Sequence, residues 1–326
     1  MQRREFITLV GGGAAAAWPH RAAAQNTAKN IRHLGVLLYT SPEEDPQARA
    51  LREGLRDLGY IDGQNISVEY RFAEGRPERL SNLAADLLRL KPDVVFPIGG
   101  DVVPFVSNAT HTIPIVFVMS ADPLQLGLVA SLARPGGNAT GLTFLQDELA
   151  SKRLELLKEL APRISRVAFL SNPDHPDNEL RVAQRTATAL GVDLHPIEMR
   201  GPSDLDGALR AIMQAPVDAL YVVASRQTVA SIPRIVNFAT KNELPLAGGW
   251  GAWTQAGGLL SYGPNVGQIV RDAAKYVDKI FKGAKPGDLP VQQPTRFELL
   301  VNLRTAKTLG LTISESLLLR ADKVIE

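Results

Sequence analysis

Short apolar runs alternate with stretches whose leucines recur at helical spacing along most of the chain. The first such stretch places Leu51, Leu55 and Leu58 on one predicted helix face, before Gly59. Repeated alternation of strand and helix predicts an α/β fold in which helices cover parallel sheets. The runs that we predict to be strands are 33–39, 66–70, 93–98, 113–119, 166–170, 192–199, 217–223, 244–248 and 257–263.

The strand and helix pattern occurs in two successive series. A Pro- and Gly-rich passage, "ARPGGNATGL" (133–142), ends the first series. A second series of strands and helices begins after it. Val36 and Val167 open matching strands and are as far apart as Pro114 and Pro245, which favours two lobes of one topology. We expect residues 31–143 to form lobe 1 and residues 144–263 lobe 2. Residues 264–290 return to lobe 1, and the strand and helix expected in 291–326 are left unassigned.

The N-terminus "MQRREFITLVGGGAAAAWPHRAAAQN" has the order typical of an export signal: arginines, an apolar run and small residues. The run from Phe6 to Trp18 is shorter than the roughly 20 apolar residues of a membrane-spanning helix. We therefore predict a signal peptide over residues 1–24, cleaved after Ala24. Arg3 and Arg4 resemble the twin-arginine signal, whose substrates are exported already folded.

Charge and composition narrow the possible functions of the mature chain. Removing residues 1–24 lowers Lys plus Arg from 36 to 33 and Asp plus Glu from 34 to 33, so no basic surface for nucleic acid is indicated. The absence of cysteine excludes disulfides, thiolate metal sites and thiol nucleophiles. No later apolar run is long enough to span a bilayer. These features predict a soluble periplasmic protein without a cofactor.

Several long segments, in order, closely resemble the solute-binding proteins of ABC transporters, in the family that contains the tryptophan- and tyrosine-type binding proteins. They are "GLRDLGYIDGQNISVEYRFAEGRPERL", "LVASLARPGGNATGLT", "GGLLSYGPN", "AAKYVDKIFKGAKPGDLPVQQPTRFELLVNLRTAKTLGL" and "SLLLRADKVIE". The resemblance implies a type I periplasmic-binding fold with two hinged Rossmann-like lobes and a small ligand in the cleft between them. It also implies a monomer that delivers its ligand to a membrane permease and the ATPase subunits of that permease.

Ligands of open parallel sheets sit beyond the carboxyl ends of the strands, so the residues at those ends are the candidate site. The candidate ligand-binding residues are Tyr39, Ser41, Gly100, Asp101, Ser120, Asp122, Asn172, Arg226 and Trp250.

The turn Gly99-Gly100-Asp101 has two interpretations. The glycines allow backbone N–H groups to approach a ligand, and Asp101 then accepts from a ligand ammonium. Alternatively, Asp101 caps the helix that follows it, a role worth about 1 kcal/mol. If Asp101 contacts the ligand, replacing it with Ala should weaken the binding of an amino acid but not the binding of a carboxylic acid that lacks an amine.

The other polar and aromatic candidates have comparable alternatives. Ser41 and Ser120 can donate hydroxyls to a carboxylate, and Arg226 either holds a carboxylate or lies solvated on the surface. Trp250 or Trp253 either stacks on a flat ligand or packs the contact between lobes. An amino acid, with an aromatic side chain as one option, is the first-choice ligand, and an aromatic acid without the amine is the second.

Catalytic and metal motifs are weak. Asp174, His175 and Asp177 stand in "SNPDHPDNE", where prolines favour a turn over a metal site. Of five His, none lies in a Ser/His/Asp elbow or a His-Glu-x-x-His helix, and no Gly-Lys-Ser or Gly-Lys-Thr marks an ATPase. We expect a binding protein and not an enzyme. The alternatives are a periplasmic sensor-type binding protein and a bilobed hydrolase.

Overall fold

A computed structural model describes residues 31–41, 45–144, 146–175 and 177–326, which belong to the folded unit Ile31–Glu326. The predictions of a signal peptide, twin-arginine export and cleavage after Ala24 lie outside the described residues. Within those ranges, no helix combines the length and apolar character that crossing a bilayer requires.

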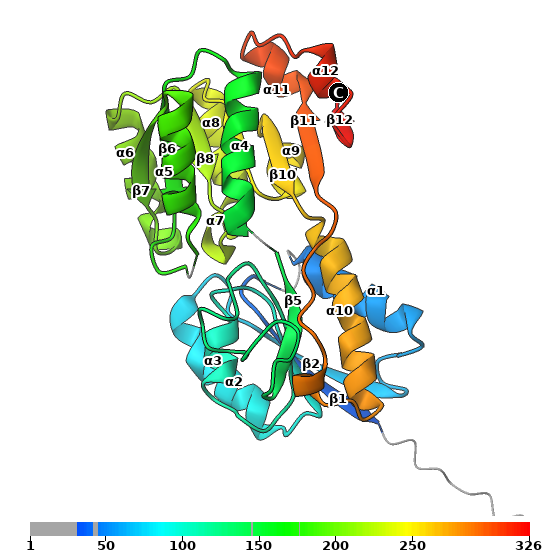
Figure 1. The fold of residues 1–326 in the computed structure, drawn as a ribbon. Coiled ribbons are helices and arrows are strands. Elements are labelled where there is room, and N and C mark those ends of the chain that lie inside the picture. The colour runs from blue at the N-terminus through cyan, green and yellow to red at the C-terminus, as the bar shows by residue number, and fades with distance from the viewer. Residues whose placement is uncertain (1–30, 42–44, 145, 176) are drawn as a thin grey trace, which may run out of the picture. The chain divides into compact units, whose positions relative to one another are not determined.

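Lobe 1 is built on a five-stranded, fully parallel sheet of order β2-β1-β3-β4-β5 (Figure 1). Its strands are β1 (Arg32–Leu38), β2 (Ile66–Phe72), β3 (Val94–Pro97), β4 (Ile115–Met119) and β5 (Ala139–Thr143). Its helices are α1 (Pro46–Asp57), α2 (Leu80–Arg89), α3 (Val103–Ser107) and, from much later in the chain, α10 (Val266–Phe281), with the 3₁₀ turns η1 (Pro77–Arg79) and η3 (Pro286–Asp288). Helix α10 packs along α1 and against β4.

Lobe 2 is built on a seven-stranded sheet of order β12-β11-β10-β9-β8-β6-β7, in which only β10 and β11 are antiparallel. Its strands are β6 (Arg166–Ser171), β7 (Asp193–Glu198), β8 (Ala219–Val222), β9 (Leu246–Gly248), β10 (Leu260–Gly263), β11 (Glu298–Asn302) and β12 (Lys323–Ile325). Its helical elements are α4 (Gln146–Leu160), α5 (Glu179–Leu190), η2 (Pro202–Asp204), α6 (Leu205–Gln214), α7 (Arg226–Ala230), α8 (Ile232–Lys241), α9 (Gly251–Gln255), α11 (Leu303–Thr308) and α12 (Glu315–Leu318).

The first five strands of each lobe follow the same order, second-first-third-fourth-fifth. An equivalent aspartate precedes the third strand in each. Asp93 accepts the backbone N–H of His33 at 2.7 Å, and Asp218 accepts that of Arg166 at 2.9 Å, so each ties down the start of the first strand. The two-lobed α/β fold predicted from the sequence is thus confirmed, and the lobes share one topology.

The chain passes between the lobes three times, after β5, after β10 and before β11. A parallel bridge between Leu142 and Gln292 joins the first and third passages. Strands β11 and β12 pair within the sheet of lobe 2, which gives a place to the C-terminal segment that the sequence left unassigned.

Strand β5 was missed because it lies in the Pro- and Gly-rich passage that we interpreted as a break between series. Its Gly141 has φ +155°, and a Cβ there would lie 2.0 Å from the carbonyl oxygen of Phe117 on β4. Only glycine lets the two strands approach so closely, so this residue, which looks like a turn signal, belongs to the sheet.

Helix burial follows the predicted stripes with one exception. Leu51 and Leu55 of α1 are buried, but Leu58 is 37% exposed because α1 ends at Asp57 and Leu58 is its C-cap. On α10, Ile269, Val270, Ala273 and Val277 are buried against lobe 1.

Candidate ligand-binding site between the lobes

His175 forms a buried polar contact across the lobes. It follows β6 in lobe 2, and its Nδ1 lies 2.5 Å from Oδ1 of Asp101 in lobe 1. Its Nε2 lies 2.9 Å from Oγ of Ser120, also in lobe 1. Gly100 permits this approach, because a Cβ at that position would lie 2.8 Å from Cε1 of His175. The turn that opens with two glycines therefore accommodates a side chain of the opposite lobe.

The protonation states of this contact follow from burial and from the paired charges. Burial by itself lowers the pKa of His175, but the Asp101 carboxylate outweighs it and raises the pKa to about 9. Burial raises the pKa of Asp101, but the imidazolium of His175 and the hydrogen bond from Arg226 bring that pKa below its usual value. At neutral pH the pair is an ion pair, and Nε2–H donates to Ser120.

Asp101 also binds the start of helix α7 in lobe 2. Its Oδ2 accepts the backbone N–H of Arg226, the first residue of α7, at 3.1 Å. The helix that follows Asp101 in sequence, α3, has no side-chain cap. Asp101 therefore does not cap its own following helix, and it accepts a backbone N–H at the start of α7, whose N-cap residue is Ser225.

Ser120, His175 and Asp101 stand in the order hydroxyl, imidazole, carboxylate, which is the order of a hydrolytic triad. Sequence motifs gave no sign of this arrangement, because the three residues lie in separate segments. A triad needs a neutral imidazole to accept the serine proton, whereas the raised pKa keeps His175 protonated. Ser120 and His175 are also buried in the contact between the lobes, which suits a structural contact better than general-base catalysis.

A second ion pair joins the lobes through Arg226, which is 3% exposed. One of its terminal nitrogens lies 3.0 Å from Oδ2 of Asp45. Asp45 is the N-cap of α1: its Oδ1 accepts the backbone N–H of Gln47 at 2.8 Å, and its Oδ2 accepts the Thr40 hydroxyl at 2.5 Å. The alternative of a solvated Arg226 is wrong, because the side chain is buried in the contact between lobes.

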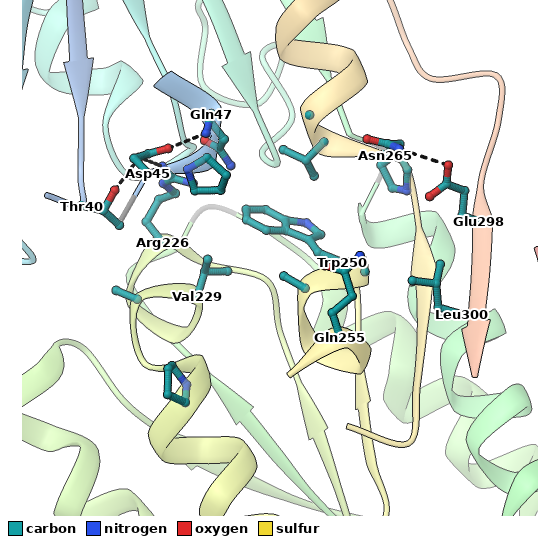
Figure 2. Close-up of a pocket in the computed structure, with 18 residues that line it drawn as sticks. Thr40, Asp45, Gln47, Arg226, Val229, Trp250, Gln255, Asn265, Glu298 and Leu300 are labelled. Atoms are coloured by element: carbon teal, nitrogen blue, oxygen red, sulfur yellow. Dashed lines mark hydrogen bonds and ion pairs between the residues drawn. The ribbon is translucent and has the colours of Figure 1, made fainter. Parts of the chain in front are cut away.

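A pocket of about 530 Å³ opens beside Arg226. Residues of both lobes line it, among them Thr40, Asp45 and Gln47 from lobe 1, Arg226, Val229, Trp250, Gln255, Glu298 and Leu300 from lobe 2, and Asn265 at the start of α10 (Figure 2). The indole of Trp250 lies between Arg226 on one side and Asn265 with Glu298 on the other. Its ring also meets Phe144 edge-on, with centroids 5.8 Å apart.

Three residues of the pocket wall carry buried polar atoms without a hydrogen-bond partner. They are Oε1 of Gln47, Nε of Arg226 and Nε1 of Trp250, and each side chain belongs to a residue at least nine-tenths buried. A buried donor or acceptor left unpaired costs about 1–3 kcal/mol. Each of these atoms has almost no accessible surface, so a molecule in the pocket would reach it only if the side chain moved.

The predicted site residues fall into three groups. Arg226 and Trp250 line the pocket, while Gly100, Asp101 and Ser120 form the contact with His175. The remaining four lie in neither: Tyr39 is buried and donates to the carbonyl of Gly75, Asp122 and Asn172 accept backbone N–H groups within their own turns, and Ser41 follows β1 half-exposed. As for the other indole, Trp253 is fully buried beneath Gly248.

Sequence reasoning missed Asp45, Gln47, His175 and Glu298. Asp45 had a usable signal, since an acid directly before Pro46 is typical of a helix N-cap followed by proline at the first helical position. His175 was weighed only as part of a metal site. Glu298 had no signal, because its place in the pocket depends on the pairing of β11 with β10.

Comparisons with known proteins agree with this architecture. The family described as ABC transporter substrate binding protein matches residues 38–325. A tyrosine-binding protein of Clostridioides difficile (strain R20291) is 26% identical over 287 residues, covering 87% of this chain and 82% of that protein.

Two solved structures are also similar. A conserved domain protein from Vibrio cholerae O1 biovar El Tor str. N16961 has a TM-score of 0.84 at 28% identity, covering 90% of this chain and 99% of its own. An ABC domain from Streptococcus pneumonia in complex with L-Trp has a TM-score of 0.82 at 26% identity, covering 90% and 100%. The chain belongs to the ABC transporter substrate-binding protein family.

Proposed function

We propose that this protein is the periplasmic solute-binding component of an ABC importer, which captures a small organic molecule and delivers it to a membrane permease. The observation that carries the proposal is the pocket of about 530 Å³ that residues of both lobes line. ATP hydrolysis would belong to separate subunits, because the sequence has no phosphate-binding Gly-Lys-Ser or Gly-Lys-Thr motif. The protein would act as a monomer after removal of its signal peptide.

The ligand that suits the pocket is an amino acid or an aromatic compound. The Trp250 indole and Leu300 offer an apolar surface to an aromatic or apolar group of the ligand. The relatives support this class: one is a tyrosine-binding protein and another was solved with L-Trp.

Capture would occur by closure of the lobes over the ligand. The ion pairs of His175 with Asp101 and of Arg226 with Asp45 form only when the lobes meet. A ligand that favours the closed state by about 3 kcal/mol shifts a two-state population more than a hundredfold.

A ligand screen followed by scattering tests the proposal. Amino acids, aromatic acids, sugars and other metabolites are tested for a rise in Tm, since a ligand at about 100 times its Kd adds roughly 2.7 kcal/mol to stability. The hit should reduce the radius of gyration at saturation and be recovered unchanged. Turnover of the hit would favour a hydrolase, and an unchanged radius would argue against closure.

A further inference from the structure

The two ring nitrogens of His175 both have their hydrogen-bond partners on the opposite lobe. Nδ1 lies 2.5 Å from Oδ1 of Asp101, and Nε2 lies 2.9 Å from Oγ of Ser120. The side chains of His175 and Asp101 are only 1% and 7% exposed. Separation of the lobes would therefore remove both partners of the imidazole at once and open the ring to water.

The charge of the ring matters for this contact as well as its hydrogen bonds. A neutral imidazole could keep both bonds, with Nδ1–H donating to Asp101 and Nε2 accepting the hydroxyl of Ser120. It would leave Asp101 buried with no positive side chain of the described residues bound to it, because Arg226 reaches Asp101 with its backbone N–H and gives its terminal nitrogen to Asp45. A buried carboxylate without a bound cation is costly, so the closed state favours a protonated His175.

Two acidic residues of lobe 2 also face the ring. Oδ2 of Asp177 lies 3.7 Å from Nε2, and Glu179, which opens α5, is bound by Arg153 at 2.8 Å. Burial lowers the pKa of His175, but Asp101, Asp177 and Glu179 together raise it to about 9 in the closed state. On opening, Asp101 leaves and water screens the two acids that remain, so the pKa falls back toward its usual value.

The other contacts between the lobes do not depend on proton uptake near neutral pH. The guanidinium of Arg226 lies 3.0 Å from Asp45, and an arginine keeps its charge where histidine titrates. The lobes also approach where a Cβ at Gly75 would lie 3.8 Å from Cγ of Pro202, a contact without charge. A change of pH near neutrality therefore acts on the contact between the lobes through His175.

We propose that His175 is a proton-binding site that holds the lobes together: proton uptake by its ring favours the closed state with or without a ligand, and proton loss favours opening. The sign follows from linkage, since the state that binds the proton more tightly gains stability as the pH falls. A solute that prefers the closed state would then bind more tightly in mildly acidic than in alkaline medium. This inference rests on the closure that the proposed function requires.

Spin labels on the two lobes can measure closure in the ligand-free mature protein. The chain has no native cysteine, so Glu78→Cys in η1 and Ser203→Cys in η2 place one exposed label on each side of the contact between Gly75 and Pro202. Double electron–electron resonance, in buffers that keep their pH on freezing, gives the populations of short and long distances. The ratio of short to long distances should fall at least about tenfold from pH 6 to pH 9.

The variant His175→Gln removes the titrating group and keeps a side chain that can form hydrogen bonds. In this variant the ratio should change less than about threefold over the same pH interval. His111→Gln, at an exposed histidine in the turn before β4, is the matched control and should behave as the unmodified protein does. The pH dependence of the unmodified protein is a second reading that does not depend on how well His175→Gln folds.

The outcomes separate this inference from the proposed function. A ratio that is independent of pH in the unmodified protein, or a single distance at both pH values, overturns the inference. A change of equal size in His175→Gln overturns it as well. Each of these results leaves a solute-binding protein, because the proposed function fails only if the metabolite screen raises no Tm.

Discussion

The Nδ1 atom of His175 lies 2.5 Å from Oδ1 of Asp101, and the two residues belong to different lobes. Both side chains are almost completely buried. A single buried charge costs several kcal/mol, and a paired one is tolerated only where its partner is in place. The contact is therefore stable only while the lobes meet, which makes it sensitive to pH and to the loss of either partner.

Stability should fall above neutral pH because of this contact. The folded pKa of His175 is raised to about 9 from its usual 6.5, so its contribution is complete below pH 6.5 and is lost as the pH rises through about 9. Asp101 has a lowered pKa, so its contribution is lost only when the pH falls below its usual value. Thermal melts from pH 6 to 10 should show that the free energy of unfolding falls more in the unmodified protein than in His175→Gln. The difference between the two should be on the order of 3 kcal/mol. Parallel curves would contradict the ion pair.

Replacing Asp101 distinguishes a contact between lobes from a ligand contact. Asp101→Ala leaves the buried imidazolium of His175 unpaired, so we expect a loss of about 3 kcal/mol and weaker binding of every ligand by a similar factor. Asp122→Ala, at the next strand end of lobe 1, removes only a bond from the backbone of Leu124 and is the control. Calorimetry measures the affinity of each ligand for the variant. If only ligands that carry an amine lose affinity, Asp101 contacts the ligand directly.

Trp250 should report ligand binding by its fluorescence. It lines the pocket, whereas Trp253 is fully buried away from it. Trp250→Phe keeps an aromatic face but reduces the area that a ligand can contact, so affinity should fall about three- to thirtyfold and most of the ligand-induced fluorescence change should vanish. A signal that persists in Trp250→Phe would mean that the ligand binds elsewhere.

Gly141 should be intolerant of any side chain. A methyl group there would lie 2.0 Å from the carbonyl oxygen of Phe117, so β4 and β5 would have to separate. We expect Gly141→Ala to cost at least about 3 kcal/mol in urea denaturation. Gly137→Ala, in the same passage with no atom within 4 Å of its Cβ position, should be near neutral. Equal stability of the two variants would argue against the close approach of the strands.

Export should depend on Arg3 and Arg4 if residues 1–24 are the twin-arginine signal peptide that the sequence predicts. Replacing Arg3 and Arg4 by Lys should leave the precursor in the cytoplasm, because the twin-arginine pathway discriminates against lysine. Fractionation and immunoblotting measure this directly. Normal export of the double variant would favour secretion in the unfolded state.

Much of the fold could be predicted because parallel strands covered on both faces are continuous apolar runs. Strands β4 and β8 are buried along their whole length, and both lie within runs identified from the sequence. Strand β5 could not be recognised from composition, since its glycine is required by the neighbouring strand and not by a turn. Local patterns do not contain that kind of information.

The site was less predictable, because a residue's position at the end of a strand does not show whether it lines the pocket or contacts the other lobe. Arg226 and Trp250 were found at the pocket by that rule, but the same rule also selected Tyr39, which packs in the core. Asp101 was expected to contact a ligand, but it lies against His175 of the other lobe. Contacts between the lobes depend on how the two lobes are placed in three dimensions. Patterns read one strand at a time contain no information on that placement.

The three passages of the chain between the lobes mean that neither lobe is a continuous piece of the sequence. Lobe 1 takes its sheet from residues up to and including Thr143 but is covered by α10, which begins at Val266. Lobe 2 is completed by β11 and β12 at the C-terminus. A fragment that stops at Thr143 would expose the apolar face that α10 covers, so either lobe could be produced alone only by joining two distant segments.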